Sequence, residues 1–123
     1  MRGIYMELTL TETALTKLKE LLGEKTAIYL DFIDGDSPGY EGAISCTLAV
    51  SFRLLFVDQE ESTLSFDLYQ TTIDSNLGVI KAKKSSERYL ESKMVLDFNK
   101  TYFRYQLRAD SGIIAENVVV EKL

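Results

Sequence analysis

Alternation of apolar and polar residues recurs along most of this 123-residue chain, and this two-residue period restricts the fold more than any other feature. Neighbouring side chains of a β-strand point to opposite faces, so the pattern predicts strands with one buried face. The alternation is clearest at residues 27–33, 64–69 and 102–107, and further strands are expected at 7–10, 44–57, 77–81, 94–98 and 113–120. The chain is therefore expected to be mainly β.

One helix is predicted near the N-terminus, between Thr11 and Gly23. Thr11 is a good N-cap residue, and glycine commonly ends a helix. The apolar residues between them fall at helical spacing and form one stripe: Ala14, Leu15, Leu18, Leu21 and Leu22. A second, short helix is expected at residues 87–91. The predicted architecture is a single α+β domain over residues 1–123, mainly β, with an N-terminal helix, a β-rich body and one short inserted helix.

The chain has one cysteine, Cys46, and no histidine. This composition excludes a Ser-His or Cys-His nucleophile pair, an imidazole metal ligand and an intramolecular disulfide. No phosphate-binding loop or nucleophile elbow is present either, so enzyme activity is not expected. The net charge of −5 argues against a nucleic acid or an anionic membrane as partner. The sequence shows no membrane-spanning run or signal peptide, and the cytoplasm is the expected location.

Three stretches resemble the HesB-like domain of the A-type iron–sulfur cluster carriers. Residues 8–14 are similar to the opening strand and helix of that family. Residues 34–42 lie where the family has a glycine-flanked loop with its first cluster cysteine. Ser85-Ser86-Glu87-Arg88-Tyr89-Leu90, followed by Met94-Val95-Leu96-Asp97-Phe98, is similar to a helix and strand of the family. The resemblance implies a HesB-like fold and a role connected with iron–sulfur cluster biosynthesis.

The chain departs from this family at the positions that would bind a cluster. Tyr40 stands where the first cysteine would be, and the C-terminal residues 118–123 lack the Cys-Gly-Cys of the family. Because iron–sulfur clusters are held mainly by thiolates, no bound cofactor is expected. The resemblance then implies a non-catalytic binding or interaction module, accessory to cluster biosynthesis, with a protein partner. An alternative is an iron or cluster carrier that uses Cys46 across a homodimer.

Two charged groups are further candidates for binding. Asp34, Asp36 and Glu41 lie in a glycine-rich loop, close in sequence to Asp31, and could hold a cation or a small molecule. The full calcium-loop pattern is missing, because Ser45 stands where that loop needs a glutamate. A basic group could meet an acidic partner or a phosphate: Lys81, Lys83, Lys84 and Arg88. Exposed edge strands, common in small β-rich domains, would also favour a homodimer.

Overall fold

The computed structural model describes residues 5–33, 52–60 and 65–122. The chain order of its elements is strand, helix, six further strands interrupted by one short 3-10 helix, and a long C-terminal strand. These elements are β1 (Met6–Leu10), α1 (Glu12–Lys19), β2 (Thr26–Phe32), β3 (Phe52–Asp58), β4 (Thr71–Ser75), β5 (Gly78–Ala82), η1 (Lys84–Tyr89), β6 (Lys93–Asn99), β7 (Arg104–Ala109) and β8 (Gly112–Lys122).

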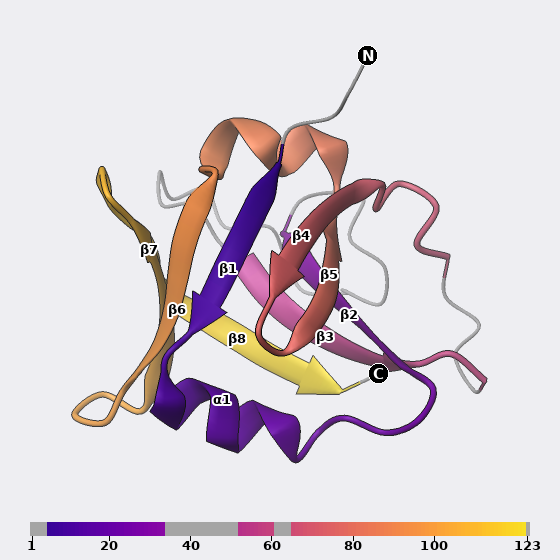
Figure 1. Ribbon diagram of the computed structural model, residues 1–123, viewed down its shortest axis with the longest axis horizontal. Coiled ribbons are helices and arrows are strands. Elements are labelled where there is room, and N and C mark those ends of the chain that lie inside the picture. Colours follow the sequence, from indigo (N-terminus) through magenta and orange to yellow (C-terminus); the bar gives the residue numbers. More distant parts are fainter. Residues whose placement is uncertain (1–4, 34–51, 61–64, 123) are drawn as a thin grey trace.

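The eight strands of the described residues form a closed barrel in the order β1-β4-β5-β2-β3-β8-β7-β6 (Figure 1). Four neighbouring pairs are antiparallel, and the other four, which include both contacts of β1, are parallel. Closure pairs every described strand on both sides and leaves no free edge. The reason for expecting a homodimer through exposed edges is therefore gone, and the oligomeric state itself stays a prediction.

The expected α+β architecture, with an N-terminal helix placed before a β-rich body, is wrong. The first described element is the strand β1, which pairs with β4 on one side and β6 on the other and so closes the barrel. The helix α1 has eight residues and lies at one end of the barrel, whereas η1 lies at the opposite end (Figure 1). The prediction that the chain is mainly β is confirmed. Closure was missed because it depends on parallel pairings between distant segments, which local periodicity does not encode.

Further segments differ from expectation. A strand was expected at residues 64–69, but residues 65–69 form no strand and residues 67–68 form a turn, whereas the polar residues 71–75 form β4. In β4 only Thr71 and Ile73 are buried, and the strand is stabilised by its pairing with β5. Tertiary pairing thus overrides local propensity here.

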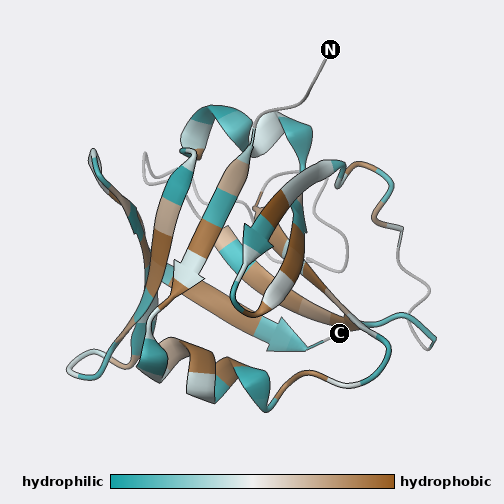
Figure 2. Ribbon diagram, in the orientation of Figure 1, coloured by the Kyte–Doolittle hydropathy of each residue, from teal (hydrophilic) through white to brown (hydrophobic). Residues whose placement is uncertain are grey.

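The core fills the interior of the barrel, and the alternation along each strand decides which residues reach it (Figure 2). Ile28 and Leu30 of β2 point inward, as predicted, and Phe32 packs against the same cluster. Ala14 and Leu18 of α1 are buried against one end of the barrel. At the η1 end, the Tyr89 ring stacks on Phe32 with a centroid distance of 4.7 Å. The two short helices therefore cover the core rather than forming a layer of their own.

Thr11 precedes α1 as predicted, but its side chain makes no capping hydrogen bond. Its hydroxyl donates instead to Oδ1 of Asp97 on β6, at 2.9 Å. The carboxylate of Asp97 also accepts from the Phe98 N–H, at 2.8 Å, and from Arg108 Nη1, at 3.0 Å. Burial raises the pKa of Asp97, but the bonds from Thr11, Arg108 and Phe98 outweigh it, so that its pKa lies below the ordinary 3.8. The start of α1 is thus tied to the barrel wall through an ionised carboxylate.

This lowered pKa predicts a pH-dependent contribution to stability. A carboxyl group whose pKa is lower in the folded state stabilises the fold above its unfolded-state pKa, and the stabilisation is lost as the pH falls through the folded-state pKa. We expect Asp97→Asn to destabilise the fold at pH 7, with the difference from wild type shrinking once the pH drops below 3.8. Urea unfolding over a pH series, with the exposed Asp74→Asn as control, measures this. A difference that stays constant down to the lowest pH would contradict it.

Candidate functional site

The site residues predicted from the sequence mostly lie outside the described residues. This holds for Cys46 and for the loop residues Asp34, Asp36 and Glu41. Asp31, the fourth acid of the group, is described. It lies on β2, is fully buried and is engaged in ion pairs, so it is not part of a solvated acidic loop.

The basic group predicted at residues 81–88 does not form one surface patch. Lys83 is 2% exposed and lies with its Nζ 3.4 Å from Oδ1 of Asp31. Lys81 donates from Nζ to Thr72 Oγ1 at 2.8 Å, and the guanidinium of Arg88 lies over the Tyr89 ring. Only Lys84 and Arg88 of this group are exposed.

A row of buried charges crosses the outer face of the barrel instead. Leu30 points into the core, so Asp31, the next residue of β2, points to the outer face. The register places Arg53 of β3 opposite Asp31, and Lys83 directly follows Ala82, which pairs with Leu30. Glu121 of β8 completes the row. We call these four residues, Lys83, Asp31, Arg53 and Glu121, the charge row.

The charge row alternates in sign from one strand to the next. Arg53 Nε donates to Asp31 Oδ2 at 2.7 Å, and Arg53 Nη1 donates to Glu121 Oε1 at 2.8 Å. Asp31 and Arg53 are 0% and 1% exposed, whereas Glu121 is 36% exposed at the open end of the row. The two positive and two negative charges compensate one another, which is what allows such groups to be buried.

Aromatic side chains from residues 65–70 lie against the same outer face. The Phe66 ring stacks on Tyr29 with a centroid distance of 4.1 Å, and the Tyr69 ring meets Tyr29 edge-on at 5.3 Å. The Tyr69 hydroxyl donates to Asp31 Oδ1, and the Lys83 Nζ lies 5.8 Å from the Tyr69 ring centroid. Residues 65–69, which belong to the strand predicted at 64–69, therefore cover the barrel wall and enclose part of the charge row.

The surroundings of Arg53 keep it charged. Burial lowers the pKa of its guanidinium, but the hydrogen bond and charge of Asp31, with a smaller contribution from Glu121, outweigh that effect and hold the pKa above its ordinary value. The charge row thus joins side chains from β2, β3 and β8 to Lys83, the residue that follows β5. Each charged group of the row contacts a neighbour of opposite charge. Such an arrangement is typical of a network that stabilises the fold.

Sequence reasoning missed the charge row. Its members lie at positions 31, 53, 83 and 121, so no local motif joins them. The one available signal was the placement of Arg53 within the apolar run Phe52–Val57 and of Asp31 beside Leu30 and Phe32. A charged residue inside a strand that is otherwise apolar indicates a buried, paired charge.

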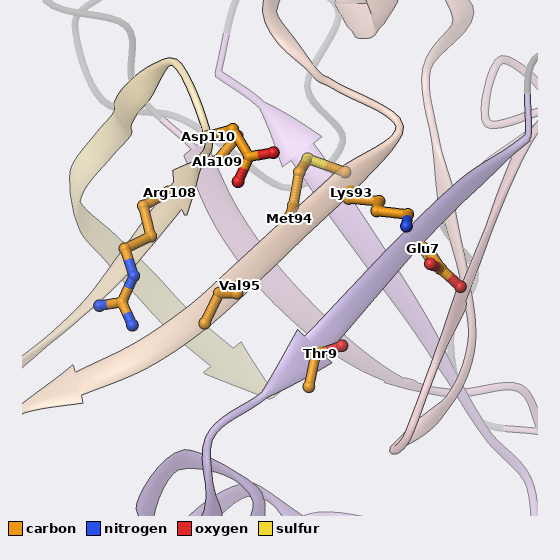
Figure 3. Close-up of a pocket in the computed structure, with 8 residues that line it drawn as sticks. All are labelled: Glu7, Thr9, Lys93, Met94, Val95, Arg108, Ala109 and Asp110. Atoms are coloured by element: carbon orange, nitrogen blue, oxygen red, sulfur yellow. The ribbon is translucent and has the colours of Figure 1, made fainter.

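A groove of about 280 Å³ lies on another part of the outer surface, over β1, β6 and the end of β7 (Figure 3). Glu7 of β1 and Lys93 of β6 are paired by register at one edge. At the other edge, Arg108 is bonded to Asp97, beyond the groove. The lining carries both positive and negative side chains, so it selects neither an anion nor a cation. The groove is lined by Glu7, Thr9, Lys93, Met94, Val95, Arg108, Ala109 and Asp110.

Two other arrangements of the described residues bear on function. Within residues 5–33, 52–60 and 65–122, no three His, Cys, Asp or Glu side chains are grouped so that they could hold a metal ion. In the same part of the chain, no helix has the length and apolar character needed to cross a membrane.

Comparison with known proteins identifies both the fold and the family. A candidate Fe-S biosynthesis protein from Lactobacillus salivarius, whose crystal structure was described as a novel fold, has 25% identity and a TM-score of 0.78, over 95% of this chain and 98% of that chain. A candidate Fe-S biosynthesis protein from Lactobacillus acidophilus has 19% identity and a TM-score of 0.67, over 95% and 90%. No curated protein matches. The model of the family described as iron-sulphur cluster biosynthesis matches residues 6–122, and the chain therefore belongs to that family.

Proposed function

We propose that this protein serves iron–sulfur cluster biosynthesis in the cytoplasm as a non-catalytic interaction module that binds a protein partner and does not itself hold the cluster. The observation that carries the proposal is the number of side chains in the sequence that could ligate a cluster. A cluster is ligated mainly by cysteine thiolates, and the whole chain offers one cysteine and no histidine.

The C-terminal strand supports the same conclusion. Residues 119–122 of β8 pair in register with residues 53–56 of β3 and form part of the barrel wall. Val118 is buried in the core, and the carboxylate of Glu121 accepts from Arg53. This segment, where the carriers of the family have their Cys-Gly-Cys, is therefore built from residues that pack and pair. The residues present do not fit a cluster that would be carried as cargo.

We propose that the protein is not an enzyme because its buried charged side chains are paired with one another. Among the described residues, the most deeply buried charges are Asp31, Arg53 and Lys83, and each contacts another member of the charge row. A general acid or base needs a pKa matched to its task and access to substrate. Asp31 and Arg53 are instead enclosed and bound to each other.

Anaerobic reconstitution with ferrous iron and sulfide tests the proposal. We expect wild-type protein to stay colourless after desalting, with an iron content equal to that of Cys46→Ser. Visible charge-transfer absorption in the wild type that is lost in Cys46→Ser would contradict the proposal and support a cluster shared between the Cys46 thiolates of two chains. Absorption that survives in Cys46→Ser would contradict the proposal as well, because side chains other than Cys46 would then hold the cluster.

A further inference from the structure

The loop between β6 and β7 carries the two most exposed aromatic side chains of the described residues. Phe103 is 78% exposed and Tyr102 is 64% exposed. The loop projects from the barrel beside the start of α1 (Figure 1). Large apolar side chains that stay in water at adjacent positions indicate a contact surface for another molecule. We call Lys100, Tyr102, Phe103 and Arg104 the aromatic tip.

The aromatic tip is held in one shape. Asn99 Oδ1 accepts from the Thr101 N–H at 2.9 Å and from the Tyr102 N–H at 3.1 Å. Phe103 has a φ of 54°, the only positive φ found outside glycine in the described residues. Its ring meets Phe98 edge-on at 5.7 Å. Glycine would suit this backbone better, so the backbone conformation does not account for a bulky side chain at this position.

Positive charge surrounds these rings. The guanidinium of Arg104 lies 4.9 Å from the Tyr102 ring centroid, and Lys17 Nζ of α1 lies 4.7 Å from the Phe98 ring centroid. Lys100 is exposed in the same loop. Among the described residues, none of these three cations forms an ion pair. The aromatic tip is thus a local cationic surface on a chain whose net charge is −5.

We propose that the aromatic tip is the docking surface for an acidic segment of a partner protein that carries at least one large apolar side chain. Tyrosine and arginine are enriched among the residues that contribute most to protein interfaces, and rings held in place lose little entropy on binding. Charge complementarity selects acidic residues on the partner. An anionic membrane is disfavoured, because the chain as a whole would be repelled. The inference rests on the proposed function only in treating the chain as an interaction module.

Binding to a panel of immobilised synthetic peptides tests this inference. The panel holds peptides in which Asp or Glu alternates with Leu or Phe, with matched sets in which Lys replaces the acids or Ser replaces the apolar residues. We expect wild type to bind only the acidic and apolar set, and more weakly as salt is added. Phe103→Gly, which suits the backbone, and the double variant Lys100→Glu with Arg104→Glu should each weaken binding about tenfold or more.

Matched controls separate the aromatic tip from the rest of the surface. Val79→Ser removes an exposed apolar side chain from β5, and Lys93→Glu reverses a charge at the other end of β6. Both should bind as wild type does. Absence of binding to the acidic and apolar peptides would overturn the inference, and so would equal binding by the tip variants.

Two other outcomes would assign the aromatic tip to a different occupant and also overturn the inference. One is binding to phosphatidylglycerol vesicles that is lost in Phe103→Gly. The other is self-association of wild type, measured by analytical ultracentrifugation, that is lost in the same variant. Iron reconstitution is read independently of all these assays. A chain that binds the peptides and also takes up a cluster would contradict the proposed function and leave the docking surface in place.

Discussion

Replacing Asp31 by asparagine is expected to lower the free energy of unfolding by about 3–5 kcal/mol, because it leaves buried cations without their counter-charge. The carboxylate of Asp31 contacts Arg53 Nε at 2.7 Å and Lys83 Nζ at 3.4 Å, and both cations are nearly inaccessible to water. It also accepts from the Tyr69 hydroxyl. Asparagine keeps the shape of the side chain but not the charge. The expected loss therefore arises from electrostatics and not from a change in packing.

Urea unfolding followed by circular dichroism measures this loss, and two variants calibrate it. Glu121→Gln removes the charge at the open end of the row, where solvent screens it, and should cost less than about 1 kcal/mol. Asp67→Asn removes an exposed acid from the turn that covers the charge row, and should leave stability unchanged. If Asp31→Asn were as stable as Asp67→Asn, the charge row would contribute nothing to the fold.

The strands whose pattern is local could be predicted from the sequence. Residues 27–33 were expected as a strand with one buried face, and β2 spans Thr26–Phe32 with Ile28 and Leu30 in the core. A strand was also expected at residues 94–98, and β6 covers this range and pairs antiparallel with β7. In both segments the information lies within a few residues, and side-chain alternation is enough to read it.

Features that depend on distant pairing could not be predicted. The barrel closes through β1, whose partners are residues 73–75 and 93–96, and nothing in residues 6–10 specifies either. The same holds for Asp31 and Arg53, which are 22 residues apart and meet only through the β2–β3 register. Sequence reasoning also concentrated on the cysteine and the acidic loop, and it placed Tyr102 and Phe103 inside the strand expected at residues 102–107, whereas β7 begins at Arg104. The solvent exposure of a side chain decides whether it packs in the core or can contact another molecule, and only the structure shows this exposure.

Replacing Phe56 by alanine is expected to cost about 3–5 kcal/mol, the range for removing a fully buried phenylalanine. Phe56 is 0% exposed and lies on β3 between Ile28 of β2 and Lys122 of β8 in the register. With one cysteine, the chain cannot form an intramolecular disulfide that would limit the effect. A domain of this size has a total stability of roughly 5–15 kcal/mol, so the variant loses a large share of it.

Phe103→Gly provides the matched control, because it deletes the same ring from a surface position. Phe103 is 78% exposed, and the loss of its edge contact with Phe98 is offset by relief of the positive φ. The change in unfolding free energy should stay below about 1 kcal/mol. Urea midpoints followed by circular dichroism compare the two variants directly. Equal losses would mean that the interior of the barrel does not carry the stability. A large difference would show that the core holds the fold and that the exposed ring of Phe103 contributes little to its stability.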